Sequence, residues 1–207
     1  MSCVNVPVRQ VRARYTAESI TVYQAYSPEI AVPALAAGRF VRPFRRERMT
    51  WIKPSFLWMM YRSGWASKPG QECVLAVEIL RGGFEWALAH ACLSHFDAGV
   101  YPDLDVWASR LRACQVRVQW DPERSLRLGP LSHRSLQVGL SGAAVDRYVD
   151  DWIVGITDVT GVARAIRDHL AAGHEEVAAG LVPEERPYPL PHPVGAVVGA
   201  DPGGQFG

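Results

Sequence analysis

Residues 39–65, RFVRPFRRERMTWIKPSFLWMMYRSGW, organise the interpretation of the whole chain. The first half of this stretch is basic and the second half is aromatic. Glu47 is its single acid, its leading cations are Arg39, Arg42, Arg45, Arg46, Arg48 and Lys53, and its rings include Trp51, Phe56, Trp58, Tyr61 and Trp65. Guanidinium groups bind phosphate oxygens and aromatic faces stack on bases. The stretch therefore predicts a face that binds phosphate or a nucleotide.

The composition of the chain is that of an ordinary globular protein. Its 207 residues are 48% hydrophobic and 21% charged, with a formal net charge of +1. This length predicts one domain plus a tail. The near-neutral charge argues against a general DNA-coating protein, which would need a broad excess of Lys and Arg. The positive charge is instead concentrated in the stretch at residues 39–65.

The cysteines and the N-terminal sequence indicate a reduced environment. Cys3, Cys73, Cys92 and Cys114 contain no C-x-x-C pair, and the first residues lack the apolar run of a secretory signal. No window approaches the roughly 18 apolar residues of a membrane span. We expect a cytoplasmic protein without a membrane contact, and the sequence does not indicate an oligomeric state.

The pattern of apolar residues predicts a mixture of strands and helices without a regular βαβ alternation. Strands are expected at 19–26, 49–52, 73–79, 114–120, 134–140 and 152–160, and helices at 28–38, 54–64, 84–96, 142–151 and 161–173. Residues 97–112 are expected to form a loop that includes a short helical turn, and residues 121–124 a turn. This order favours an α+β domain with a mixed, mostly antiparallel central sheet and flanking helices.

The domain boundaries follow from composition. Residues 1–14 form a basic N-terminal arm, and residues 15–175 form the single domain. From residue 181 to residue 207 Pro and Gly dominate, and such a segment buries too little apolar surface to offset its ordering entropy. We therefore expect residues 181–207 to be a disordered tail.

Four polar side chains are candidates for catalysis. Gln24 lies in the first long strand, where its amide could bind a ligand as both donor and acceptor. Ser55 follows Lys53-Pro54 at a predicted helix N-terminus, a position that favours an anion. Glu78 interrupts an apolar strand, and Gln137 is polar within the strand at 134–140. The candidates for holding a cofactor are Tyr23, Arg45, Arg46, Arg48, Trp51, Lys53 and Trp58.

Each candidate has a structural alternative. A single aromatic residue such as Trp58 can be a core residue of an apolar helix, with the arginines forming a solvated loop. Ser55 can simply cap its helix, and Gln24 can face water. His90-x-Cys92-x-x-His95 resembles a metal-binding fragment, but its spacing places His90 and Cys92 on different sides of a helix. We expect no metal.

Two resemblances add to this interpretation. The segments VYQAYSPEIA, KPSFLWMMYR, WDPER, RSLQVGL and YVDDWIVGITDVT resemble a bacterial and fungal domain-of-unknown-function family, family 4291, over most of residues 9–172. The opening strand–helix–strand–helix order is also similar to the ADP-ribosyltransferase fold. In that superfamily successive strands carry a His or Arg, a Ser or Tyr, and a Glu. This resemblance places Gln24, Ser55 and Gln137 at those positions.

Together these observations predict a nucleotide-dependent transferase that uses NAD or another nucleotide, with ADP-ribosyl transfer as the reaction that the second resemblance implies. Gln137 departs from the superfamily's carboxylate. A non-catalytic module that binds RNA or single-stranded nucleic acid would use the same residues. A scaffold whose tryptophan-rich face docks a partner is the third alternative.

Overall fold

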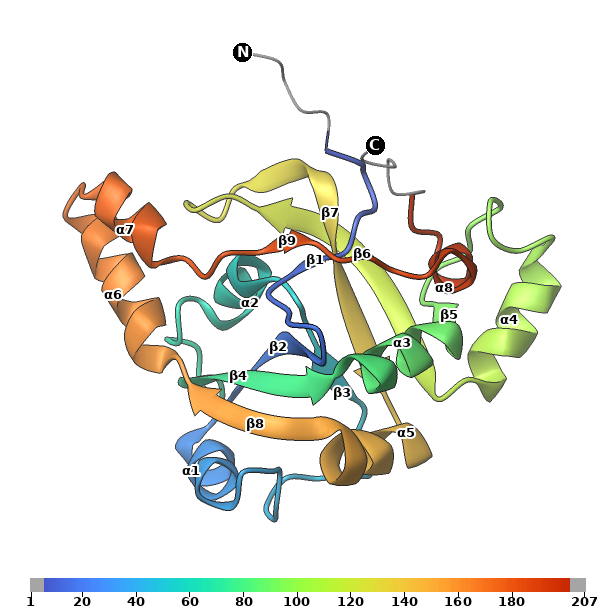
Figure 1. The fold of residues 1–207 in the computed structure, drawn as a ribbon, viewed down its shortest axis with the longest axis horizontal. Helices are drawn as coiled ribbons and strands as arrows, with labels where there is room; N and C mark the ends of the chain where they lie inside the picture. The colour runs from blue at the N-terminus through green and yellow to red at the C-terminus, as the bar shows by residue number, and fades with distance from the viewer. Residues whose placement is uncertain (1–5, 202–207) are drawn as a thin grey trace.

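The computed structural model describes residues 6–201 as an α+β domain with three sheets (Figure 1). Most neighbouring strands in these sheets pair in the antiparallel direction. The first sheet has the order β2-β4-β8, and its strands are β2 (Ser19–Tyr26), β4 (Cys73–Leu80) and β8 (Ile153–Asp158). The second has the order β3-β7-β6-β5, and its strands are β3 (Thr50–Ile52), β7 (Pro130–Leu140), β6 (Val116–Arg124) and β5 (Ala91–Leu93). Only β5 and β6 pair in parallel within these two sheets. The predicted class is confirmed, but the expected central sheet is divided.

The two large sheets meet where β2 crosses the end of β3. The Tyr23 N–H donates to the Lys53 carbonyl at 2.7 Å, and the Lys53 N–H donates to the Tyr23 carbonyl at 3.3 Å. This single antiparallel bridge joins the sheets. It also fixes the backbone of Lys53, which lies between β3 and the next helix.

The helices pack against both sheets. Those of the first half are α1 (Pro28–Ala37), α2 (Phe56–Ser63), α3 (Arg81–Ala89) and α4 (Leu104–Ala113). Those of the second half are α5 (Ala143–Arg147), a π-helical turn (Tyr148–Trp152), α6 (Thr160–Ala171), α7 (Glu175–Leu181) and α8 (His192–Val197). Helix α2 contacts both β2 and β6, so it bridges the two sheets. None of the helices in residues 6–201 is long and apolar enough to cross a membrane.

Helix α2 begins and ends where its sequence indicates. The Ser55 hydroxyl accepts a hydrogen bond from the Trp58 N–H at 3.1 Å, which satisfies one of the free donors at the helix N-terminus. Gly64 ends the helix with φ of 60°, a left-handed conformation that favours glycine. The face between these ends is buried through Phe56, Met59 and Met60. The short, apolar helix is thereby held in one orientation beside the sheet junction.

Three local predictions were wrong. Helix α3 stops at Ala89, and residues 91–93 form β5 beside β6 instead of continuing the helix. Residues 104–113, expected to contain no more than a short helical turn, form the ten-residue helix α4, which the Asp103 carboxylate caps by accepting from the Val106 N–H at 2.7 Å. Residues 121–124, expected as a turn, belong to β6. The turn lies at residues 125–129, where Leu128 has φ of 62° and the Ser125 N–H donates to the Gly129 carbonyl.

The chain after residue 181 differs from the expected disordered tail. It crosses the domain beside the N-terminal segment, where β1 (Arg12–Ala13) pairs with β9 (Arg186–Pro187), and it then forms α8 (Figure 1). Tyr188 and Val198 are buried, and the Trp120 indole N–H donates to the Val198 carbonyl at 2.8 Å. Prolines lower the entropy that an extended segment loses on docking, so few apolar anchors are enough. Residues 1–5 and 202–207 of the predicted arm and tail lie outside the described residues.

Candidate functional site

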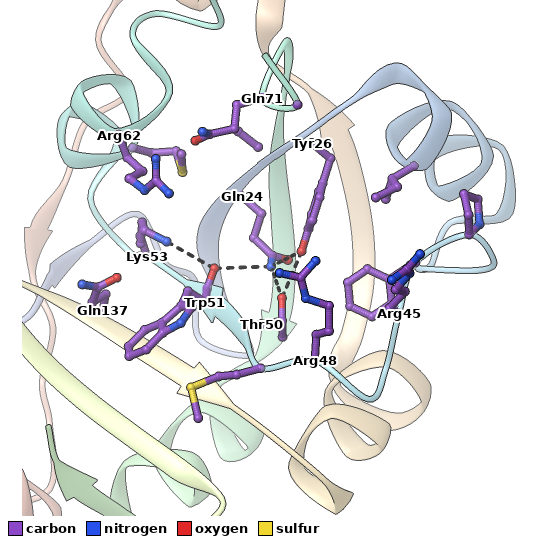
Figure 2. Close-up of a pocket in the computed structure, with 17 residues that line it drawn as sticks. Gln24, Tyr26, Arg45, Arg48, Thr50, Trp51, Lys53, Arg62, Gln71 and Gln137 are labelled. Carbon is purple, nitrogen blue, oxygen red and sulfur yellow. Dashed lines mark hydrogen bonds between the residues drawn. The ribbon is translucent and has the colours of Figure 1, made fainter. Parts of the chain in front are cut away.

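A cavity of about 550 Å³ opens where the two large sheets meet (Figure 2). We call it the basic cavity. Strand β2 contributes Gln24 and Tyr26, strand β3 contributes Thr50 and Trp51, and strand β7 contributes Gln137. Its cationic lining residues are Arg45, Arg48, Lys53 and Arg62. Most of this lining comes from the basic and aromatic stretch at residues 39–65, which the sequence identified.

The charged side chains that line the basic cavity are all cationic. None of its described lining residues is an aspartate or a glutamate. Within residues 6–201 no ion pair involves any of its four cations. Positive charge gathered around a concave surface concentrates anions. The cavity is therefore electrostatically suited to an anionic ligand.

The floor of the basic cavity is a closed network of hydrogen bonds. The Gln24 amide nitrogen is within bonding distance of the Tyr26 hydroxyl (2.8 Å), the Thr50 hydroxyl (2.7 Å) and the Trp51 carbonyl (3.3 Å). The Gln24 amide oxygen accepts from the Tyr148 hydroxyl at 2.6 Å. The Gln24 amide is thus occupied by the protein itself. The hydroxyls of Tyr26 and Thr50, 3.0 Å apart, lie in the part of the cavity that Figure 2 shows between the cations.

Lys53 is the buried cation of the basic cavity, with only 5% of its surface exposed. Its amine lies 3.4 Å from the Trp51 carbonyl and 5.2 Å from the centre of the Trp58 ring. The pKa of Lys53 is lowered to about 7, mainly by burial and to a smaller degree by the nearby charge of Arg62, while Asp121 acts in the opposite direction. The Lys53 amine is therefore expected to change between its charged and neutral forms near neutral pH.

Arg46 lies on the same loop as Arg45 and Arg48 but has a different environment. It does not line the cavity, and its guanidinium forms ion pairs with Asp150 (2.5 and 2.7 Å) and Asp146 (3.0 Å). Hydrogen bonds to these two carboxylates raise the pKa of Arg46. The ion pairs fasten the loop to α5 and the π-helical turn, while Arg45 and Arg48 face the cavity.

Two of the aromatic candidates pack inside the protein. The Tyr23 ring packs edge-to-face on Phe56 at 5.3 Å, and Trp58, which is 7% exposed, packs edge-to-face on Tyr61 at 6.4 Å. Neither lines the basic cavity. Among the predicted stacking residues, Trp51 is the one that lines it.

A second, smaller pocket of about 250 Å³ is lined in part by Ser55, Glu123 and Glu185. We call it the carboxylate pocket. The Ser55 hydroxyl donates to Glu123 at 2.9 Å, and Glu185 accepts from the Phe56 N–H, at the start of α2, at 2.6 Å. Burial and the neighbouring Glu123 raise the pKa of Glu185 to about 8. The helix N-terminus at which a ligand anion was expected therefore holds a carboxyl group of the protein.

The two remaining catalytic candidates lie apart from each other. Gln137 lines the basic cavity, and its amide donates to Asp121 at 2.7 Å. Glu78 is exposed on β4, where it pairs with Thr21 of β2 and Gly155 of β8. The structure thus brings six of the predicted residues to one cavity, namely Gln24, Arg45, Arg48, Trp51, Lys53 and Gln137, and places Ser55, Glu78, Tyr23, Arg46 and Trp58 elsewhere.

The sequence reasoning missed Arg62 and the two carboxylates of the second pocket. Arg62 follows Met59 by three residues on α2, a spacing that places both on one helix face, so this signal was available. Glu123 was assigned to a turn and Glu185 to the tail. Both interpretations depended on local composition, whereas the pairing of β6 with β7 and the docking of the C-terminal segment are long-range contacts.

The fold and the site define an α+β protein with a cationic cavity between two sheets. A family model described as Domain of unknown function (DUF4291) matches residues 10–188, so the chain belongs to this family, as the sequence motifs predicted. The match includes both the basic cavity and the carboxylate pocket. No curated protein matches the chain.

Proposed function

We propose that the basic cavity binds a nucleotide and that the protein is a nucleotide-dependent transferase, with NAD as the candidate donor of an ADP-ribosyl group. The observation that carries this proposal is the set of four cations around a 550 Å³ cavity whose described lining contains no carboxylate. Cavities of this size accommodate cofactor-sized ligands. Phosphate groups would supply the negative charge that the lining lacks.

The lining residues have complementary parts in this proposal. Arg45, Arg48 and Arg62 offer forked donors for phosphate oxygens. The indole of Trp51 offers a face on which a base or a nicotinamide ring can stack. The hydroxyls of Tyr26 and Thr50 are suited to ribose hydroxyls, and burial raises the pKa of Tyr26 to about 12, which keeps it a neutral donor.

The resemblance to the ADP-ribosyltransferase fold supports the choice of NAD. Two of the three residues that it selects, Gln24 and Gln137, line the same cavity, whereas Ser55 bonds to Glu123. The Gln24 amide is already occupied, so we assign it to holding the floor. A cationic sugar formed here would be stabilised by the donor phosphates and by Gln137, which is itself oriented by Asp121.

One observation supports the alternative of nucleic-acid binding. Tyr61 is 41% exposed on α2, with the Arg124 guanidinium 3.5 Å and the Lys68 amine 5.9 Å from its ring centre. An exposed ring flanked by cations is suited to an unpaired base. An RNA strand could extend from the basic cavity over this surface.

Calorimetric titration with NAD, ATP and a short RNA, each at low and high salt, tests these proposals. Saturable binding of NAD or ATP at one site is the expected result. The Arg45→Ala/Arg48→Ala variant should weaken it at least about 100-fold, because two charge-assisted hydrogen-bond donors are lost. Arg42→Ala is the matched control, since Arg42 is exposed on the same loop outside the cavity lining.

The outcomes separate the alternatives. RNA affinity that grows with strand length and falls steeply with salt, without nucleotide binding, would favour the nucleic-acid module. Equal nucleotide affinity in the double variant and the control would overturn the assignment of the basic cavity. Once binding is established, mass spectrometry of the products identifies the transferred group.

A further inference from the structure

Lys53 is unusual in this chain because it is one of only two lysines, the other being Lys68, among 22 basic residues. Lys68 is exposed, and its amine donates to the Arg62 carbonyl at 2.9 Å. Lys53 instead lies in the basic cavity with 5% of its surface exposed. Phosphate binding alone does not require a buried lysine, because arginine forks provide better phosphate donors.

We propose that Lys53 is a nucleophilic amine that forms an imine with the carbonyl carbon of a phosphate-bearing aldehyde or ketone in the basic cavity. The ligand class includes a phosphorylated sugar whose anomeric carbon opens to an aldehyde, as in the sugar that remains when a nucleotide loses its base. This inference rests on the proposed function, because the arginines of the cavity supply the phosphate site.

The position of the amine is fixed by the fold. The Lys53 backbone is bound on both its N–H and its carbonyl by Tyr23 at the sheet junction. Its amine lies beside the Trp51 carbonyl and the Trp58 ring. A nucleophile held in one place reacts faster because less orientational freedom has to be lost.

The charges around Lys53 favour its uncharged form. Arg62 on α2 carries like charge, and burial in the cavity disfavours the ammonium. Asp121 on β6, whose two oxygens accept hydrogen bonds from Gln119 and Gln137, acts in the opposite direction and is the smallest of the three effects. A lysine that is desolvated beside another cation is the activated form that attacks carbonyl carbons.

The arrangement of the cavity allows a ligand to reach both groups. Figure 2 shows Lys53 and Arg62 on one side, Arg45 on the other, and Arg48 in the middle of the view beside the Tyr26 and Thr50 hydroxyls. A phosphate held by Arg45 and Arg48 leaves the rest of the ligand to extend toward Lys53. The hydroxyls between the two sides are suited to the ligand's own hydroxyl groups.

The reaction needs no oxidant or reductant. The Lys53 lone pair adds to the carbonyl carbon, so that a carbon–nitrogen bond forms and the carbonyl electron pair takes up a proton to give a carbinolamine. Loss of that hydroxyl as water then forms the carbon–nitrogen double bond. The two protons that leave as water balance the two lost from the amine.

Pyridoxal 5′-phosphate is a suitable probe because it carries both an aldehyde and a phosphate. We would incubate the intact protein with it at pH 7, reduce any imine with borohydride, and measure labelling of each lysine by peptide mapping. Lys68 is the internal control. Because ordinary lysines have a pKa of about 10.4, we expect labelling of Lys53 to exceed that of Lys68 by about tenfold or more.

Three comparisons test whether the ligand's phosphate contributes to the labelling of Lys53. Pyridoxal, which lacks the phosphate, should label Lys53 about tenfold more slowly. In the Arg45→Ala/Arg48→Ala variant, the rate at which pyridoxal 5′-phosphate labels Lys53 should fall by a similar factor. Inorganic pyrophosphate should protect Lys53 and leave Lys68 unaffected.

The outcomes separate this inference from the proposed function. Labelling of Lys68 as fast as Lys53, in a protein that binds a nucleotide saturably at one site, would overturn the inference alone. Selective labelling of Lys53 that does not depend on the phosphate, the arginines or pyrophosphate would overturn the phosphate site, and with it both proposals. Selective, phosphate-dependent labelling of Lys53 supports the inference.

Discussion

The residues around the start of α2 contribute to both the basic cavity and the carboxylate pocket, through Lys53 and Ser55 respectively, and each region contains an ionisable group with a shifted pKa. In the basic cavity, burial lowers the pKa of Lys53 to about 7. In the carboxylate pocket, burial raises the pKa of Glu185 to about 8. The physical cause is the same, since burial disfavours whichever form is charged.

The two regions differ in what satisfies their polar groups. The two carboxyl groups of the carboxylate pocket have partners within the protein, because Glu185 accepts from the N-terminal N–H of α2 and Glu123 accepts from the Ser55 hydroxyl. The cations of the basic cavity form no ion pairs within residues 6–201. A helix N-terminus beside a lysine is therefore insufficient to locate a ligand site. The informative feature is charge that the described protein leaves uncompensated.

The replacement Glu185→Gln should have the largest effect on stability. The pKa of Glu185 is raised from 4.5 to about 8 by folding. Between these pH values the folded state keeps a proton that the unfolded state loses, so the free energy of unfolding falls as pH rises through this window. Glutamine keeps an acceptor for the Phe56 N–H without a charge. We expect the variant to be more stable than the wild type at pH 8, by on the order of 2 to 4 kcal/mol.

Urea unfolding at pH 5 and pH 8 measures this difference. Glu184→Gln is the matched control, because Glu184 is the exposed neighbour in the chain. The free energy of unfolding of the control should fall between pH 5 and pH 8 by as much as that of the wild type. If the stability of Glu185→Gln falls between pH 5 and pH 8 as much as that of the wild type, the carboxylate pocket does not raise the pKa of Glu185. The contrast between the two regions would then be wrong.

The replacement Lys53→Met should give a smaller change with the opposite pH dependence. Folding lowers the pKa of Lys53 from 10.5 to about 7, so the unfolded state binds more protons between pH 7 and pH 10.5. Wild-type stability therefore rises through that window and is lowest below pH 7. Methionine fills similar space without a charge, so we expect a gain on the order of 1 to 3 kcal/mol at pH 6 that shrinks toward pH 10.

The same unfolding measurements at pH 6 and pH 10 test this prediction. Lys68→Met serves as control, because it removes an exposed lysine and should leave the pH dependence unchanged. A Lys53→Met variant with the wild-type slope between pH 7 and pH 10 would show that Lys53 is solvated, which would contradict its placement in the basic cavity.

The sequence was most informative where a short segment determines its own structure. The Pro54-to-Gly64 helix and the strand at 19–26 follow from capping residues and β-branched patterning, and the cluster of cations at 39–48 indicated two of the four cations that line the basic cavity. The side chain that each arginine contacts was not predictable locally. Arg46 pairs with Asp146 and Asp150, about a hundred residues away in the chain, and only the folded structure brings them together.

Long-range contacts also explain the errors at the C-terminal end. The segment after residue 181 has few apolar residues, and its composition indicates disorder. It is ordered because individual anchors, such as Tyr188 and Glu185, dock into sites built by α2 and α3. Composition counts such anchors but does not indicate whether a site for them exists.

The replacement Tyr148→Phe tests the floor of the basic cavity and should cost about 1 to 3 kcal/mol of stability. It leaves the buried Gln24 amide oxygen without the donor that now lies 2.6 Å away. Nucleotide affinity should fall only a few-fold, because the cations are unchanged. Tyr15→Phe removes a hydroxyl that donates to the Pro187 carbonyl at a partly exposed position, and it should cost less. Equal losses in the two variants would contradict the buried network.

The replacement Arg46→Ala should have the smallest effect. Its ion pairs with Asp150 and Asp146 are solvent-exposed, and exposed pairs contribute about 0 to 1 kcal/mol. The loop is also held by the stacked rings of Phe40 and Phe44, 4.7 Å apart. We therefore expect a small loss of stability that disappears at high salt, measured by thermal unfolding at two salt concentrations.

Nucleotide affinity in Arg46→Ala gives the most direct comparison within the loop. Arg46 faces Asp146 and Asp150 while Arg45 and Arg48 face the basic cavity, so the affinity should fall no more than about threefold, against about 100-fold for the Arg45→Ala/Arg48→Ala variant. A loss as large as that of the double variant would mean that Arg46 leaves its carboxylates to bind the ligand. In that case a cation that already has carboxylate partners within the protein would also bind the ligand. The absence of an ion pair would then no longer be the feature that separates the basic cavity from the carboxylate pocket.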